Sequence, residues 1–274
     1  MIELSPTSAL VLKMTKGLCY TDELSRKYLN LLDLSAGDEV YNECKKVWEH
    51  YPEIIVNRKY SVWALIKFAL KENKNIHQVI ILAAGLAPLS LDIHSCYPDI
   101  DIFDVDIDLM KEKKRLYNRV FENKKICFVE CDITDTEKLR TLLVKKGWNP
   151  DSDSLIVFEG ISYYLKKYKT KEIFDCLLPS CGNSLIIADI LPPSEFIEEE
   201  RRQYPQKFFE IICKKCNISE ETRYYHKELN TFLGFEIIQL FNMRIAEFLR
   251  TGENKYFLTD ESSWRDVVLL RRYN

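Results

Sequence analysis

The sequence lacks the features that mark several large classes of protein. No apolar run approaches the roughly 20 residues that a transmembrane helix needs, and residues 1–10 lack the basic-then-apolar order of a signal peptide. Neither sign of charge dominates, because 39 lysines and arginines stand against 42 aspartates and glutamates, for a formal net charge of -3. These absences predict a cytoplasmic protein with no membrane partner and no nucleic-acid partner.

The cysteines do not form the pattern of a disulfide framework. There are nine, an odd number, and they are scattered through mostly apolar surroundings. Cys213 and Cys216 form one CxxC pair, but His226 is the only further ligand candidate nearby, and a structural zinc site needs four ligands. We therefore expect buried, reduced thiols and no metal site.

What the sequence does contain indicates one α/β domain. The chain has 274 residues, 46% of them hydrophobic, with no internal repeat and no linker-like tract. Residues 1–75 repeat apolar side chains at three- and four-residue spacings, which predicts a helical N-terminal region. Residues 192–233 are polar and helix-like, which predicts a helical cap.

The pattern of the remaining residues, 76–191 and 234–274, predicts the cofactor-binding sheet core of the domain. Five short apolar runs alternate with amphipathic segments, which predicts a parallel sheet covered on both faces by helices. The predicted strands are 77–84, 99–106, 125–131, 153–159 and 183–189. Two further strands, 234–241 and 264–273, are separated by a loop and are expected to pair antiparallel. A seven-stranded, mostly parallel sheet closing in such a hairpin is typical of the Rossmann-like class I S-adenosylmethionine-dependent methyltransferase fold. A dinucleotide-binding domain would continue with another crossover helix.

The stretch IILAAGLAP, residues 80–88, ends the first predicted strand. The small residues Ala83, Ala84 and Gly85 allow the backbone to approach an adenosyl group closely. A diphosphate is disfavoured, because Ala83, Gly85 and Pro88 occupy the three glycine positions of the G-x-G-x-x-G motif. The alternative is that this stretch merely ends a buried strand.

An acid follows the next strand at the distance that an adenosine site requires. Asp106 lies 21 residues after Gly85, where such sheets place the acceptor for the ribose hydroxyls. Asp104 lies on the same side of the predicted strand, and of the two we favour Asp106.

Two further strands also end in acids. Asp132 is placed to accept a hydrogen bond from the adenine amino group, with Ile133 packing on the ring, and Glu159 is placed to face the methionine end of the cofactor. Each acid alone is equally typical of a helix cap or of the surface, so the prediction depends on the whole set.

The chain resembles the leucine carboxyl methyltransferase family, which includes bacterial O-methyltransferases. The resemblance is carried by SPTSALVLKMTKG, DELSRKY, NRKY, VIILAAGL, FDVD, ECDITD and FEGISYYL, in this order. It implies S-adenosylmethionine as the cofactor, with contacts at Gly85, Asp106, Asp132, Ile133 and Glu159. It also implies that Arg58 binds the methionine carboxylate. Members commonly continue with an Asp-Thr-Arg type sequence after LAAGL, whereas this chain has Ala87-Pro88-Leu89.

The acceptor is expected to be a carboxylate of a small molecule or peptide. A carboxylate is already ionised at pH 7, whereas a phenol, with a pKa of about 10, usually needs a general base. None of the four histidines adjoins the predicted crevice. Tyr163 and Tyr164 are candidates to orient the acceptor or line the methyl path, or simply to pack in the core. The alternative functions are O-methylation of a hydroxyl, an inactive binding protein with this fold, and an NAD(P)-dependent oxidoreductase.

Overall fold

The computed structural model describes residues 4–17, 19, 22–121, 125–178, 183–216 and 222–272. The part before the first strand is helical. Its helices are α1 (Pro6–Thr15), α2 (Glu23–Leu29), α3 (Asp38–Val47) and α4 (Tyr51–Glu72), with a short 3₁₀ turn at Ser35–Gly37. None of the helices described is long and apolar enough to cross a membrane.

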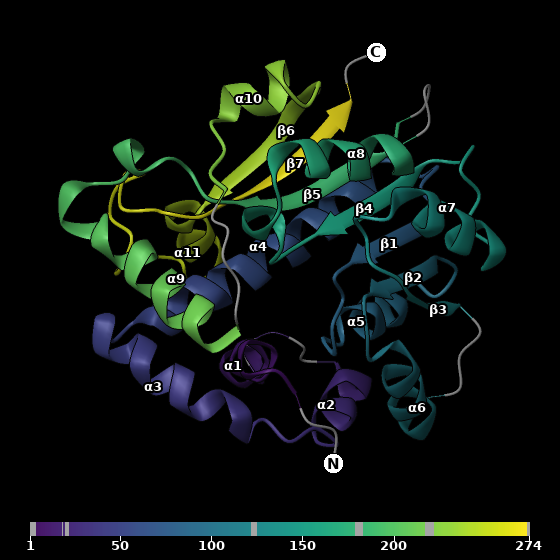
Figure 1. Cartoon of the computed structure of the whole chain (residues 1–274), viewed down its shortest axis with the longest axis horizontal. Helices are drawn as coiled ribbons and strands as arrows, with labels where there is room; N and C mark the ends of the chain where they lie inside the picture. The colour runs from purple at the N-terminus through teal and green to yellow at the C-terminus, as the bar shows by residue number, and fades with distance from the viewer. Residues whose placement is uncertain are drawn as a thin grey trace.

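A seven-stranded sheet forms the centre of the fold (Figure 1). Its strands are β1 (Gln78–Leu82), β2 (Asp101–Asp106), β3 (Ile126–Glu130), β4 (Ser154–Phe158), β5 (Leu185–Ile190), β6 (Phe235–Asn242) and β7 (Asp266–Arg272). They lie in the order β3-β2-β1-β4-β5-β7-β6, with β1 to β5 parallel and β7 antiparallel to both of its neighbours. The mostly parallel sheet with an antiparallel closing pair is therefore confirmed.

The connection between β6 and β7 corrects the sequence prediction, which has a loop there. Met243–Thr251 forms helix α11, which packs against α4. Asn242 caps its start by accepting a hydrogen bond from the Ile245 amide (2.9 Å), and Gly252 ends it at φ +85°. The nine residues between these capping residues carry apolar side chains at helical spacing, with Met243 and Ala246 buried, so the sequence does contain the signal for this helix.

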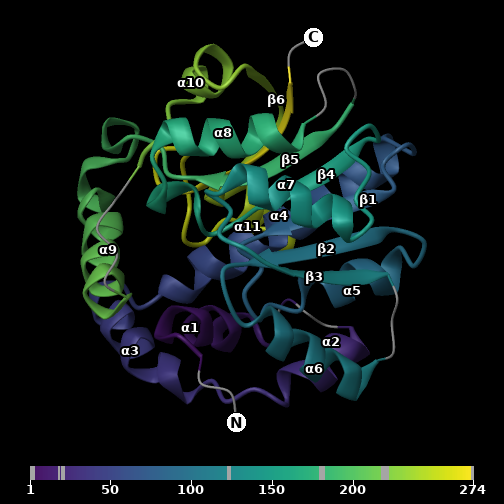
Figure 2. The same ribbon diagram turned by 45° about the vertical axis from the view of Figure 1, so that its right-hand side comes forward.

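Helices cover both faces of the sheet (Figures 1 and 2). One face carries α4, α5 (Leu89–Cys96) and α6 (Met110–Val120), and the other carries α7 (Thr136–Lys145), α8 (Lys167–Leu177) and α10 (His226–Thr231). Strand β1 shows how the sequence produces two cores. Val79 and Ile81 pack in the core on the α4 face, while Ile80 and Leu82 pack in the core on the α7 face. Successive side chains of a strand point to opposite faces, so an apolar run supplies both.

A third layer lies beyond the carboxyl edge of the parallel strands. Short 3₁₀ turns at Ser194–Phe196 and Glu199–Arg201 lead from β5 into α9 (Gln203–Cys216), which lies beside α1 and α3 (Figure 1). Apolar side chains of these helices, of α4 and of the segment before β7 form their own core cluster, which includes Leu10, Ile54, Phe208 and Trp264. This layer faces the sheet edge at which ligands bind in open α/β folds.

Candidate active site

The loop after β1 is held against the end of β2. The Ala84 amide donates to the Val105 carbonyl (2.9 Å), and the Gly85 amide donates to Oδ2 of Asp106 (2.7 Å). Ala83 and Gly85 have positive φ angles of 51° and 48°, so Ala83 adopts a conformation usually left to glycine. A Cβ built on Gly85 would meet no atom within 4 Å. The loop therefore turns sharply and leaves open space at Gly85.

Asp106 retains the capacity to bind a ligand. Its second oxygen, Oδ1, accepts a hydrogen bond from the Ile107 amide (2.7 Å). Burial raises the pKa of Asp106 above its ordinary value, while the bonds from the Gly85 and Ile107 amides oppose that shift. Because each carboxylate oxygen has two lone pairs, each still offers one acceptor position. An adenosyl group with a ribose diol fits this combination of a small-residue loop and a partly open carboxylate.

Asp132 and Ile133 follow β3 at the same edge. The Cys131 amide donates to the Asp106 carbonyl (2.8 Å), which fixes the end of β3 against the end of β2. Asp132 is exposed, and its Oδ1 accepts bonds from the amide and the hydroxyl of Thr134, both at 2.8 Å. Ile133 is buried in the core on the α7 face. The structure thus brings both residues to the predicted edge but not into the cavity described below.

A buried ion-pair chain lies where α4 passes the end of β4. Nε of Arg58 lies 2.9 Å from Oε1 of Glu159, and Nζ of Lys59 lies 2.9 Å from Oε2. All three side chains are at most 10% exposed. Burial by itself would raise the pKa of Glu159, but Lys59 and Arg58 together hold that pKa below its ordinary value. Glu159 is therefore ionised at neutral pH.

The chain continues through Tyr163 to Arg265, which directly precedes β7. Nη1 of Arg58 donates to the Tyr163 hydroxyl (3.3 Å), and Nη1 of Arg265 donates to the same oxygen (3.2 Å). Arg265 also pairs with Asp189 at the end of β5, and its guanidinium lies 4.8 Å from the centre of the Tyr163 ring. We call the linked side chains of Lys59, Glu159, Arg58, Tyr163, Arg265 and Asp189 the charged chain.

The charged chain borders a cavity of about 200 Å³. The cavity is also lined by the loop Ala83–Ala87, by Tyr164 and by apolar side chains from α1, α4 and α9. The rings of Tyr163 and Tyr164 meet edge to face, with centres 4.6 Å apart. Burial raises the pKa of Tyr164, which keeps its phenol protonated at neutral pH.

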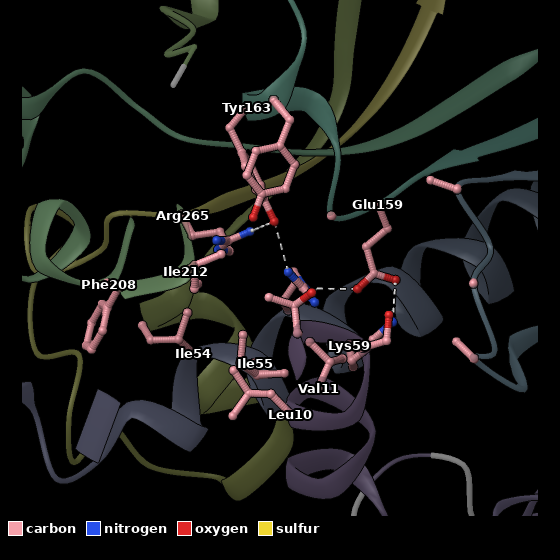
Figure 3. A pocket seen from close by; sticks show the side chains of 18 of the residues that line it. Leu10, Val11, Ile54, Ile55, Lys59, Glu159, Tyr163, Phe208, Ile212 and Arg265 are labelled. Carbon is pink, nitrogen blue, oxygen red and sulfur yellow. Dashed lines mark hydrogen bonds and ion pairs between the residues drawn. The ribbon is translucent and has the colours of Figure 1, made fainter. Parts of the chain in front are cut away.

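The cavity has two chemically different ends (Figure 3). Glu159 and Lys59 lie at one end, on the side of the β1 loop. Arg265 lies at the other, beside Phe208, Ile54 and Ile212 (Figure 3). The polar end thus adjoins the predicted cofactor loop, and the apolar end lies under α9.

Asp104 has a different role from Asp106. It is fully buried, with its Oδ2 2.8 Å from Nζ of Lys113 and 2.6 Å from Oγ of Ser90. Lys113 Nζ also lies 3.5 Å from the Ala84 carbonyl oxygen. Asp104 and Lys113 therefore support the loop from within the core, which leaves Asp106 as the candidate for a ligand contact.

Sequence reasoning missed Lys59, Asp189 and Arg265. Asp189 carried the same signal as the predicted acids, an acid at the carboxyl end of a parallel strand. Arg265 precedes an antiparallel strand, whose amino end lies at the carboxyl edge of the parallel strands. Lys59 follows Arg58 in the sequence, and no sequence pattern indicates that it belongs to the site.

No group of three His, Cys, Asp or Glu side chains within the described ranges is arranged to hold a metal ion. The CxxC pair is not tested further by the structure, because the side chain of Cys216 lies outside the described residues.

Comparison with known proteins adds a family and a fold. The family model described as leucine carboxyl methyltransferase matches residues 20–178, more than half of the chain. No curated protein matches the chain significantly.

Several solved structures share the whole architecture at low sequence identity. A putative methyltransferase from Thermobifida fusca YX has 17% identity and a TM-score of 0.69, over 97% of this chain and 94% of that one. A DUF574 family protein from Streptomyces avermitilis MA-4680 has 15% identity and a TM-score of 0.66, over 97% of both chains. The plantazolicin methyltransferase BamL, solved with a triazolic desmethylPZN analog and SAH, has 10% identity and a TM-score of 0.50, over 98% and 99%. At these identities the likeness establishes the fold, the predicted Rossmann-like methyltransferase architecture.

Proposed function

The chain belongs to the leucine carboxyl methyltransferase family, and on this premise we propose that it transfers the methyl group of S-adenosylmethionine to a carboxylate oxygen of its acceptor. As a member it is an S-adenosylmethionine-dependent methyltransferase, which is the enzyme class and the cofactor that the sequence predicts. The acceptor and its reacting oxygen are the proposed part.

The observation that carries the proposal is the charge of the cavity. Within the described charged chain, Arg58, Lys59 and Arg265 contribute three positive charges, and Glu159 on the cavity wall and Asp189 beside Arg265 contribute two negative ones, which leaves one positive charge in excess. A buried charge is costly unless an opposite charge pairs with it. The methionine carboxylate of the cofactor brings one negative charge, but its ammonium and sulfonium bring two positive ones. The loaded site therefore still favours an anionic acceptor.

The cavity also lacks a group suited to deprotonate a hydroxyl. Its described lining contains no histidine, Glu159 has a pKa held low by two cations, and the Tyr164 phenol stays protonated. A phenol or alcohol acceptor would need a base with a pKa nearer to neutral. A carboxylate acceptor needs none, because it is ionised before it binds.

Individual residues are assigned roles by their position. We assign the ribose hydroxyls to Asp106, the adenine amino group to Asp132, the adenine ring to Ile133, and the methionine end to Arg58 and Glu159. Ala83, Ala84 and Gly85 provide the close backbone approach, and Tyr163 and Tyr164 orient the acceptor. When it is bound, S-adenosylmethionine would supply the methyl group. The methyl carbon would form a bond to an acceptor oxygen while its bond to sulfur breaks, and the electron pair of that bond would stay on sulfur. The task of the charged chain is to align the acceptor and to exclude water.

The test is a panel of matched acceptors. Formation of S-adenosylhomocysteine is measured with carboxylic acids and with the alcohol or phenol of the same carbon skeleton. We expect turnover with at least one acid and none with its matched alcohol or phenol. Turnover only with hydroxyl acceptors would overturn the carboxylate proposal. Binding of S-adenosylhomocysteine without turnover on any acceptor would instead support an inactive binding member.

A further inference from the structure

Arg265 is held in place on one side and lacks a partner on the other. It is 8% exposed, and its Nη1 donates to Tyr163 and pairs with Asp189. Its Nε is buried with no hydrogen-bond partner, and no described residue bonds to its Nη2. Nε–H and the neighbouring Nη2–H form the edge of a guanidinium that grips a carboxylate through two parallel hydrogen bonds.

Arg265 differs from Arg58, the other buried arginine of the charged chain, at this edge of the guanidinium. Nε of Arg58 also lacks a well-aligned hydrogen bond, but it lies 2.9 Å from Oε1 of Glu159, so an opposite charge already stands at that edge. Arg58 pairs with Glu159, which lies with Lys59 at the polar end of the cavity, whereas Arg265 lies at the end under α9 (Figure 3). A buried donor without a partner destabilises the protein unless a ligand satisfies it.

Beyond Tyr163 and Asp189, Arg265 has apolar side chains beside it in the cavity. Phe208, Ile54 and Ile212 lie beside it in the cavity (Figure 3). Within the cavity lining that is described, no charged side chain stands at this end other than Arg265 itself. An acceptor whose carboxylate meets Arg265 must therefore place an uncharged, apolar body against these side chains.

We propose that Arg265 anchors the acceptor, and that the acceptor is a small monocarboxylic acid with a branched aliphatic or aromatic body. The inference rests on the proposed methyl transfer to a carboxylate and names the class of acid. Tyr163 and Asp189 are positioning residues, because their contacts with Nη1 hold the Arg265 guanidinium at the cavity wall. A cavity of about 200 Å³, below the usual range of about 300–1,000 Å³ for ligand pockets, selects a small body.

The test measures acid binding to protein saturated with S-adenosylhomocysteine. The probes for calorimetry are phenylacetate and 3-methylbutanoate, with the uncharged 2-phenylethanol and the dicarboxylate succinate as comparisons. We expect the two monocarboxylates to bind more tightly than both comparisons. Equal binding of 2-phenylethanol and phenylacetate would overturn the anchoring role, and tighter binding of succinate would overturn the apolar body.

Variants then locate the contact. Arg265→Lys keeps a positive charge beside Asp189 but lacks the two-bond edge, so we expect about tenfold weaker acid binding and unchanged S-adenosylhomocysteine affinity. The double variant R265M/D189N removes the buried pair together and serves if the lysine variant is unstable. Arg271→Lys, on the exposed end of β7, is the matched control and should bind like the wild type. Unchanged acid binding in both Arg265 variants would overturn the inference.

Different experimental results would contradict the anchoring role of Arg265 and the proposed methyl transfer. If an acid is methylated with the same KM in wild type and R265K, methyl transfer stands and the role of Arg265 is wrong. If R265K weakens acid binding but no acid is ever methylated, the anchoring site stands and the proposed function is wrong.

Discussion

Replacing Ala83 by glycine is expected to stabilise the protein, because Ala83 holds a left-handed backbone conformation at φ +51° in the loop after β1. That conformation costs a residue with a Cβ about 1–2 kcal/mol. Glycine avoids this cost but gives up roughly 0.5–1 kcal/mol of chain entropy on folding. Ala83 is only partly buried, so little packing is lost with its methyl group.

The difference predicts a gain of about 0–1.5 kcal/mol, with a midpoint of about 0.75 kcal/mol, in the free energy of unfolding of Ala83→Gly. For a chain of this size the melting temperature should rise by ~2 °C. Equilibrium urea unfolding, followed by circular dichroism, measures the change. Ala84→Gly is the matched control, because Ala84 is buried at an ordinary φ. It should lose about 1–2 kcal/mol through chain entropy and the buried methyl. Equal destabilisation by both substitutions would refute the reasoning.

Three further substitutions test the site and its support. Asp106→Ala should weaken S-adenosylhomocysteine binding by about 1.5–3 kcal/mol in calorimetry, because a charge-assisted contact is lost. Asp92→Asn should stabilise the protein at pH 8 relative to wild type and not at pH 4, as measured by urea unfolding. Burial raises the pKa of Asp92 from 3.8 to about 7, so wild-type stability falls as the pH rises through that window. Lys113→Met should lower the free energy of unfolding by about 3–5 kcal/mol, because it leaves Asp104 buried without its counter-ion.

For each of these three substitutions, a specific result would contradict the prediction. The exposed Asp108→Ala is the control for Asp106, and equal effects on binding would mean that Asp106 does not contact the ligand. Parallel pH profiles for wild type and Asp92→Asn would place the titrating group elsewhere. The double variant D104N/K113M should recover much of the loss in Lys113→Met, and no recovery would contradict the ion-pair account.

The fold could be predicted because its signals are local. Each parallel strand is a short apolar run between amphipathic helices, and β1 alone shows how such a run packs into two cores. The closing pair was predictable from two apolar runs without a crossover helix between them. Helix α11 was not predicted, although the capping residues Asn242 and Gly252 enclose apolar side chains at helical spacing, because a segment of nine residues between two strands is also compatible with a loop.

The candidate site could be predicted only in part. Gly85 and Asp106 belong to adjacent strands at one sheet edge, so their proximity follows from topology, and the structure joins them by a 2.7 Å hydrogen bond. The charged chain depends on contacts between α4, β5 and the start of β7. Its members Arg58, Asp189 and Arg265 are far apart in the sequence, and only the packed structure shows which edge of each guanidinium is occupied.

The central claim, methyl transfer to a carboxylate, is tested most directly by the alkali lability of the product. The enzyme is given S-adenosylmethionine with a labelled methyl group and an acceptor that supports turnover, and the product is treated with mild base. A methyl ester releases its methyl group as volatile labelled methanol, whereas a methyl ether or methylamine does not. The account predicts release of the label, and a product whose label stays bound in base would contradict it.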